Sequence, residues 1–445
     1  MGLALGYTAP AYVDLEKSTI LSDDQAKRNE QKSLIGSMLA IGALIGGLLG
    51  EPSNKIFGRR LSLILYGIPF VSGWALIMLA NGLTMLVFGR FLTGLCCGLV
   101  SGTAPTYVVE IAPPQIRGLL GTCFQVMVVI GILLAAVFGT FLNWNQLAGA
   151  SITAAVGMSA LMLAMPETPQ WLLSKNKNEE AEASLKKLRT SAINAEFNLM
   201  TQSANNSQQA GSQYSLELLK SREFYKPFVL ALGLMFFQQF SGINAVLFYQ
   251  SDIFKKTAPK LDALQATIYV CVAQVVATIL GSVLVDRLGR RILLLASGIG
   301  HTVSLIIFGI YSHISLQDKV FQENYAWIAL LSLIVFISSF SVGYGPIPWM
   351  MIPELSSARV RSLVASIATA FNWTCVYIVT AFVKSLMTAV GDDCTYWLFA
   401  IVCALSCCFV FLFLPETKGR SSEQIQLELL GEPEQVREGT LKAMA

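Results

Sequence analysis

The sequence contains few charged residues. Asp, Glu, Lys and Arg make up only 13% of its 445 residues, whereas apolar residues make up 54% and the mean hydropathy is +0.59. Soluble globular proteins contain about 25% charged residues, so this composition excludes an ordinary soluble protein. We therefore predict an all-α protein that crosses a membrane many times.

The residue types that catalytic and metal sites need are also scarce. The chain has two histidines, and most of its nine cysteines lie inside apolar runs without the spacing of metal ligands. The apolar runs contain no pair of carboxylates, no Cys–His arrangement and no glycine-rich nucleotide loop. We therefore expect no enzyme activity, no cofactor, no metal site and no disulfide framework. The net charge of +3 is unremarkable, and we expect no nucleic-acid partner.

A membrane-spanning helix needs about 20 apolar residues. Eleven segments meet this requirement, at 33–52, 62–80, 84–109, 119–142, 147–165, 227–254, 264–285, 291–312, 326–352, 362–388 and 395–414. A charged connection at 14–32 separates them from residues 1–13, an apolar run of about half the spanning length. We therefore expect eleven complete spans and a first helix that is truncated at its N-terminus, as in a shortened isoform or an incomplete gene model.

A polar stretch divides the chain into two halves. We predict an N-terminal bundle at 1–165, a connection at 166–226, a C-terminal six-helix bundle at 227–414 and a tail at 415–445. Residues 179–189 (EEAEASLKKLR) predict a short amphipathic helix at the membrane surface, because acids precede bases among helix formers. Most of the 31 Lys and Arg residues flank the spans on the side of the connection. The connection and the C-terminus are therefore predicted to be cytoplasmic.

The two halves repeat three short motifs in the same order. These are GRR at 58–60 and 289–291, Glu followed seven residues later by Arg at 110–117 and 354–361, and PET at 166–168 and 415–417. Three matched motifs indicate a duplication. Duplicated six-helix halves are the architecture of major facilitator transporters, which rock one half against the other around a central site.

Polar amides interrupt the apolar segment at 227–254. Gln238, Gln239 and Asn244 lie there around Gly242. Amides inside a membrane are costly unless they face a cavity or another helix, and a glycine allows the helix to bend or open. Uncharged amides both donate and accept hydrogen bonds, which suits the hydroxyls of a sugar better than an ion. The alternative is that these amides only join neighbouring helices.

Further motifs carry a resemblance to a known family. They are GRFLTG at 89–94, PETPQW at 166–171, QQFSGIN at 238–244, DRLGRR at 286–291, GPIPW at 345–349, FNW at 371–373 and PETKGR at 415–420. With them, the chain resembles the sugar porter family of the major facilitator superfamily, and most of all the arthropod facilitated trehalose transporters and related glucose facilitators. The resemblance covers nearly the whole chain. It implies a major facilitator fold of two six-helix halves.

The resemblance also implies a sugar site made of uncharged amides and one tryptophan. The matching residues are Gln125, Gln238, Gln239, Asn244, Gln274, Trp349 and Asn372. Each of these side chains can form hydrogen bonds with, or stack on, a pyranose ring. A packing role remains the alternative for each one.

A second set of residues matches the gate of the family. It comprises Arg59, Glu110, Arg117, Arg290, Glu354 and Arg361, which form breakable ion pairs, with Pro346 and Pro348, which interrupt the tenth helix. Simple enrichment of positive charge on the cytoplasmic side is the alternative for the charged members, and a fixed kink for the prolines. The chain departs from the family at Lys55, Gln170 and Ser341, where relatives have an acid, an arginine and, in some, a glutamate.

Proton-coupled relatives carry an aspartate in the first helix, where this chain has Thr8. Threonine does not titrate, so we predict a passive uniporter for trehalose or a hexose that works by alternating access in the plasma membrane. A sugar sensor without transport and a proton-coupled symporter are the alternatives. The expected partners are the sugar and the lipid bilayer, without an obligatory protein partner.

Overall fold

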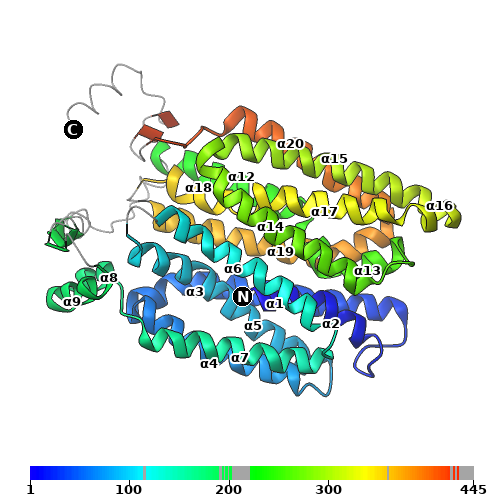
Figure 1. Ribbon diagram of the computed structural model, residues 1–445, viewed down its shortest axis with the longest axis horizontal. Helices are drawn as coiled ribbons and strands as arrows, with labels where there is room; N and C mark the ends of the chain where they lie inside the picture. Colours follow the sequence, from blue (N-terminus) through cyan, green and yellow to red (C-terminus); the bar gives the residue numbers. More distant parts are fainter. Residues whose placement is uncertain are drawn as a thin grey trace.

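The fold, given by a computed structural model, is a bundle of long helices. The structure describes residues 1–113, 117–189, 193–194, 196–198, 200–202, 221–357, 360–420, 424–425 and 428–429. Figure 1 shows the long helices side by side along the long axis, with α8 (Pro169–Ser174) and α9 (Asn178–Leu188) beyond one end and α16 (Lys319–Asn324) at the other. We call these ends the connection end and the opposite end.

The N-terminal half holds the helices before the connection. They are α1 (Gly2–Gly6), α2 (Thr8–Leu15), α3 (Gln25–Phe57), α4 (Arg59–Met78), α5 (Leu83–Ile111), α6 (Arg117–Phe138) and α7 (Trp144–Ala164). The C-terminal half follows the connection. Besides α16, its helices are α12 (Arg222–Phe240), α13 (Ile243–Thr257), α14 (Ala263–Leu288), α15 (Arg290–Gln317), α17 (Ala326–Val342), α18 (Ile347–Leu355), α19 (Arg361–Val390) and α20 (Asp392–Phe413).

Eleven stretches of the described chain are long and apolar enough to cross a membrane. They correspond one by one to the eleven predicted spans, so this prediction is confirmed. Two of them contain a break: α12 and α13 together form one stretch, and α17 and α18 form another. Helices α1 and α2 add a short helical run that packs on α6 and α13.

The predicted connection at 14–32 is wrong over its second half, because α3 begins well before residue 33. The Asp24 side chain accepts a hydrogen bond from the Ala26 N–H at 3.1 Å and so caps the helix. The charge of Lys32 does not end the helix, because its ammonium lies 2.6 Å from the Glu16 carboxylate. The sequence prediction did not include the ion pair between Lys32 and Glu16.

Both predicted interruptions of helices are present. Gly242 has a φ of +87° between α12 and α13, and a Cβ there would lie 2.7 Å from the Phe399 ring. Only glycine adopts this left-handed backbone at little cost. The helix also stops between Val342 and Ile347, where Pro346 provides no backbone donor. At these breaks, main-chain groups inside the bundle lack helical hydrogen-bond partners. Side chains can bind them instead.

The halves repeat each other in three dimensions as well as in sequence. Gly58 and Gly289 precede α4 and α15 with φ values of +87° and +93°. The two halves then meet along two equivalent pairs of helices: α3 packs along α19, and α6 along α14. In Figure 1 α6 and α14 lie next to each other where the two halves adjoin. Four long helices therefore form most of the interface between the halves.

Candidate functional site

Four of the predicted sugar-site amides form one hydrogen-bonded cluster, which we call the amide cluster. Asn372 Nδ2 donates to Gln238 Oε1 at 2.7 Å, and Gln239 Nε2 donates to Asn372 Oδ1 at 3.2 Å. Asn244 Nδ2 donates to Gln239 Oε1. All four side chains are buried. Amides from α12, α13 and α19 are thus brought together in the C-terminal half.

The break after α12 makes this cluster possible. In an unbroken helix, residues five positions apart are not neighbours on one face. The left-handed Gly242 turns the chain so that Asn244, at the start of α13, reaches back to Gln239 near the end of α12. Ser241 Oγ satisfies the Gln238 carbonyl at 2.7 Å. The polar backbone at the break is therefore partly bound by its own side chains.

Gln238 also joins the two broken spans. Its Nε2 donates to the Tyr344 carbonyl at 2.7 Å and to the Gly345 carbonyl at 3.1 Å. These carbonyls lie in the gap between α17 and α18, where the helix does not satisfy them. An unsatisfied carbonyl in a membrane interior costs several kcal/mol by general estimate, roughly 2–7. Gln238 therefore has a clear structural role beside its predicted one.

The other three predicted sugar-site residues lie apart from these hydrogen bonds in the described chain. Gln274 of α14 is only 2% exposed, and its Oε1 has no partner among the described residues. Gln125 of α6 and Trp349 of α18 are half-buried. Trp349 packs against a cluster of apolar residues from α12, α18 and α19. Because buried polar atoms are normally bonded, the Gln274 oxygen needs a partner that the described residues do not supply.

A buried arginine in the N-terminal half lies next to Thr8, the residue at the position where proton-coupled relatives carry an aspartate. Arg90 of α5 is fully buried, and its Nη2 donates to the Thr8 hydroxyl at 2.9 Å. Its Nη1 donates to the Ala4 carbonyl, also at 2.9 Å, and its guanidinium lies 5.5 Å from the centre of the Tyr7 ring. No carboxylate of the described residues forms an ion pair with it. The guanidinium of Arg90 is therefore stabilised by neutral groups among the described residues.

The predicted gate residues form two equivalent ion pairs at the connection end. Arg59 Nη2 lies 3.0 Å from Glu110 Oε1, and Arg290 Nη2 lies 3.1 Å from Glu354 Oε1. Each pair joins two helices of the same half. Arg361 donates to the Ser356 carbonyl at 3.3 Å. The side chain of Arg117 lies outside the described residues, so the structure does not place this gate residue.

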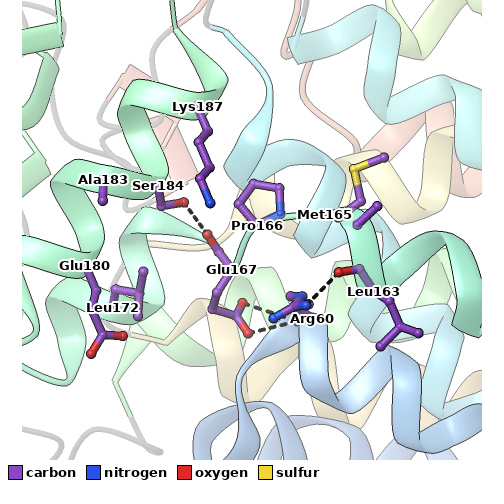
Figure 2. Close-up of a pocket in the computed structure, with 11 residues that line it drawn as sticks. Arg60, Leu163, Met165, Pro166, Glu167, Leu172, Glu180, Ala183, Ser184 and Lys187 are labelled. Carbon is purple, nitrogen blue, oxygen red and sulfur yellow. Dashed lines mark hydrogen bonds between the residues drawn. The ribbon is translucent and has the colours of Figure 1, made fainter.

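The glutamates of the two PET motifs have a role that the sequence did not predict. Glu167 accepts hydrogen bonds from the backbone N–H groups of Arg59 at 3.1 Å and Arg60 at 3.0 Å, and Glu416 does the same for Arg290 and Arg291, both at 3.0 Å. Figure 2 shows the Glu167 carboxylate directed at Arg60 beside a pocket of about 360 Å³. Each carboxylate thus caps a helix that begins at a GRR motif.

The electrostatics of Glu416 follow from this arrangement. Burial alone would raise the pKa of this carboxyl. The backbone N–H groups of Lys418, Arg290 and Arg291 outweigh this effect and hold the pKa below its ordinary value. The repeated PET and GRR motifs were the available signal, because both motifs recur in the same order in each half.

Comparisons with known proteins agree on the kind of protein. The family described as "Sugar (and other) transporter" matches residues 4–429. The Tret1-2 homolog, a facilitated trehalose transporter of Drosophila sechellia, is 38% identical over 97% of this chain and 88% of its own length. The Tret1 facilitated trehalose transporter of Bombyx mori is 35% identical over 98% of this chain and 85% of its own length.

Solved structures show the same architecture. The proton:xylose symporter XylE, with bound 6-bromo-6-deoxy-D-glucose, is 26% identical and has a TM-score of 0.80 over 96% of both chains. An inward-open form of XylE from E. coli has a TM-score of 0.77. The predicted major facilitator fold is therefore confirmed. This chain belongs to the sugar transporter family of the major facilitator superfamily, and it is a multi-pass membrane transporter rather than an enzyme.

Proposed function

We propose that this protein carries trehalose or a hexose passively across the plasma membrane by alternating access. The observation that carries the proposal is the amide cluster at the break between α12 and α13. It offers donors and acceptors without a net charge, which suits a neutral polyol and disfavours a substrate ion. The named relatives that are facilitated trehalose transporters support the choice of sugar.

The members of the amide cluster differ in the hydrogen bonds that they form outside it. Gln238 binds main-chain carbonyls, so part of its role is to keep the broken helices together. Among the described residues, by contrast, the amide groups of Gln239 and Asn244 are hydrogen-bonded only to other amides of the cluster. Such bonds can be exchanged for bonds to sugar hydroxyls without stranding the backbone. We therefore assign the main sugar contacts to Gln239, Asn244 and Asn372, with Gln274 adding an acceptor and Gln125 and Trp349 completing the site.

Passive transport is supported by the surroundings of Arg90. An acid at position 8 would lie within hydrogen-bond distance of the guanidinium, where its protonation would alter a buried ion pair. Thr8 provides a hydroxyl that keeps its proton at all physiological pH values. A proton therefore has no acceptor at this place, and in this proposal the concentration gradient of the sugar alone drives net transport.

The charged residues at the connection end form the proposed gate. The pairs Arg59–Glu110 and Arg290–Glu354 stabilise each half, and Arg117 and Arg361 would add contacts as the halves approach. Pro346, before α18, and Pro348, in its first turn, provide no backbone donors, so the gap can move without breaking helix hydrogen bonds there. From the distribution of Lys and Arg, this end and the C-terminus face the cytoplasm.

A competition assay tests the substrate. Purified protein in proteoliposomes is given labelled trehalose together with unlabelled trehalose, glucose, fructose or sucrose. We expect trehalose or a hexose to compete, with saturable flux above that of empty liposomes. Sugar binding without any flux would instead show a sensor.

A further inference from the structure

Five charged side chains meet between the two halves at the opposite end of the bundle. Glu16, directly after α2, and Lys32 of α3 belong to the N-terminal half, whereas Asp252 and Lys255 of α13 and Lys384 of α19 belong to the C-terminal half. We call this group the opposite-end network. None of these residues matches a motif that the sequence comparison used.

Two of the four ion pairs in the network cross from one half to the other. Lys32 Nζ lies 2.6 Å from Glu16 Oε1 within its own half and 3.0 Å from Asp252 Oδ2 across the interface. Lys255 Nζ crosses in the other direction to Glu16 Oε2 at 2.8 Å. Lys384 binds Asp252 Oδ2 at 3.2 Å within the C-terminal half. Lys32 is only 2% exposed, and the two carboxylates offset the cost of burying its ammonium.

Neutral contacts seal the interface around the charges. The rings of Tyr12 and Tyr249 lie 5.8 Å apart across the interface. Ser33 Oγ donates to the Ala381 carbonyl across the interface at 2.6 Å, and Tyr249 OH donates to the Thr380 carbonyl within the C-terminal half at 3.3 Å. Helices α2 and α3 are therefore bound to α13 and α19 at the level of the network. The two halves are closed against each other at this end.

The network also borders a pocket of about 450 Å³ that all five side chains line. The exposed residues Gln25 and Thr388 lie on its rim, one from each half. Burial alone would raise the pKa of Glu16, but the hydrogen bonds from Lys255 and Lys32 outweigh it and lower that pKa. Its carboxylate is therefore charged at neutral pH, and water in the pocket can hydrate charges that separate.

We propose that the opposite-end network is a lock that keeps this end closed while the sugar site opens toward the connection end. Opening breaks the two crossing pairs, Lys32–Asp252 and Lys255–Glu16. Each half then keeps one pair of its own, Glu16–Lys32 and Asp252–Lys384, and Lys255, which is already 38% exposed, enters water. No buried charge is left without a partner, so the lock biases the equilibrium without blocking the cycle. This inference rests on the alternating access proposed above.

The size of the bias follows from the exposure of the pairs. A partly exposed ion pair contributes up to a factor of about five to an equilibrium constant. Lys255→Met removes one crossing pair and leaves both pairs within the halves intact. Asp252→Asn removes the other crossing pair together with the Asp252–Lys384 pair within the C-terminal half. We expect each to raise the fraction of molecules open at this end about two- to fivefold.

Spin labels at the rim measure this opening. Gln25→Cys and Thr388→Cys are labelled in the full chain, in a background where the cysteines that are not buried are serine, and the distance between the labels is measured by pulsed electron paramagnetic resonance. Lys260→Met is the matched control, because its 2.9 Å pair with Glu323 lies at the same end but within one half. We expect the population with a long distance between the labels to be larger than in the parent for Lys255→Met and Asp252→Asn. For Lys260→Met we expect no such increase.

Identical distance distributions in Lys255→Met, Lys260→Met and the parent would overturn the lock. Lys255 is exposed enough for its variant to fold, so the test does not depend on the more buried Asp252. Sugar flux through the unlabelled parent is measured separately. A parent that moves no sugar defeats the carrier, whereas a transporting parent whose distances do not respond to Lys255→Met defeats the lock alone.

Discussion

Replacing Gln239 with leucine should weaken sugar binding while keeping the fold. Its amide donates to Asn372 at 3.2 Å and to Gln238 at 3.3 Å and accepts from Asn244, so both ends of the amide face the cluster. If each end binds one sugar hydroxyl, the variant loses two hydrogen bonds of about 0.5–1.5 kcal/mol each. At 1.4 kcal/mol per factor of ten, the KM should rise about 5- to 100-fold. Initial rates of labelled trehalose uptake in proteoliposomes measure this change.

The chain offers a matched control in the same broken span. Gln250 of α13 is also buried, but its Nε2 donates to the Thr267 carbonyl of α14 at 3.2 Å, away from the amide cluster. Gln250→Leu removes an amide of the same size and should leave the KM within about twofold, since it strands only one carbonyl. An unchanged KM in Gln239→Leu, or an equal rise in Gln250→Leu, would refute the assignment of Gln239 to the sugar site.

Three further results are expected. Thr8→Asp places a titratable group beside Arg90, so flux should become dependent on pH, whereas the parent and Thr8→Val should give flat pH profiles; a flat profile for Thr8→Asp would count against the proton argument. Glu416→Gln should lower the free energy of unfolding by about 1–2 kcal/mol at neutral pH. Because the pKa of Glu416 is depressed in the fold, its contribution is present above the ordinary carboxyl pKa and is lost as pH falls through the lowered value, so thermal melts of parent and variant should converge in acid. Gly242→Ala should reduce folded yield through about 1–2 kcal/mol of backbone strain, whereas Gly157→Ala, which has open space for the added carbon, should not; equal yields would contradict the strain.

The sequence was sufficient for the spans and the breaks, because these depend on local chemistry. Runs of apolar residues determine the helices, and Gly242 and Pro346 mark positions where a helix cannot continue unchanged. The amides Gln238 and Asn372 could be matched to motifs one by one. Their mutual hydrogen bond, between α12 and α19, required the fold.

Long-range charge pairing could not be predicted in the same way. Lys32 resembles part of a polar connection until Asp252, 220 residues later in the chain, is brought to it by the packing of the two halves. The role of Glu416 as a cap for α15 likewise depends on a contact between distant segments. An isolated sequence states that these charges exist but not which partner neutralises each one.

The most direct test of the proposed passive sugar carrier is a time course of labelled trehalose uptake into proteoliposomes, with and without an inward proton gradient. The account predicts uptake above that of empty liposomes that stops at equal concentrations on both sides, with or without the gradient. Accumulation above the external concentration that collapses when a protonophore is added, or the absence of any flux for trehalose and for glucose, would contradict it.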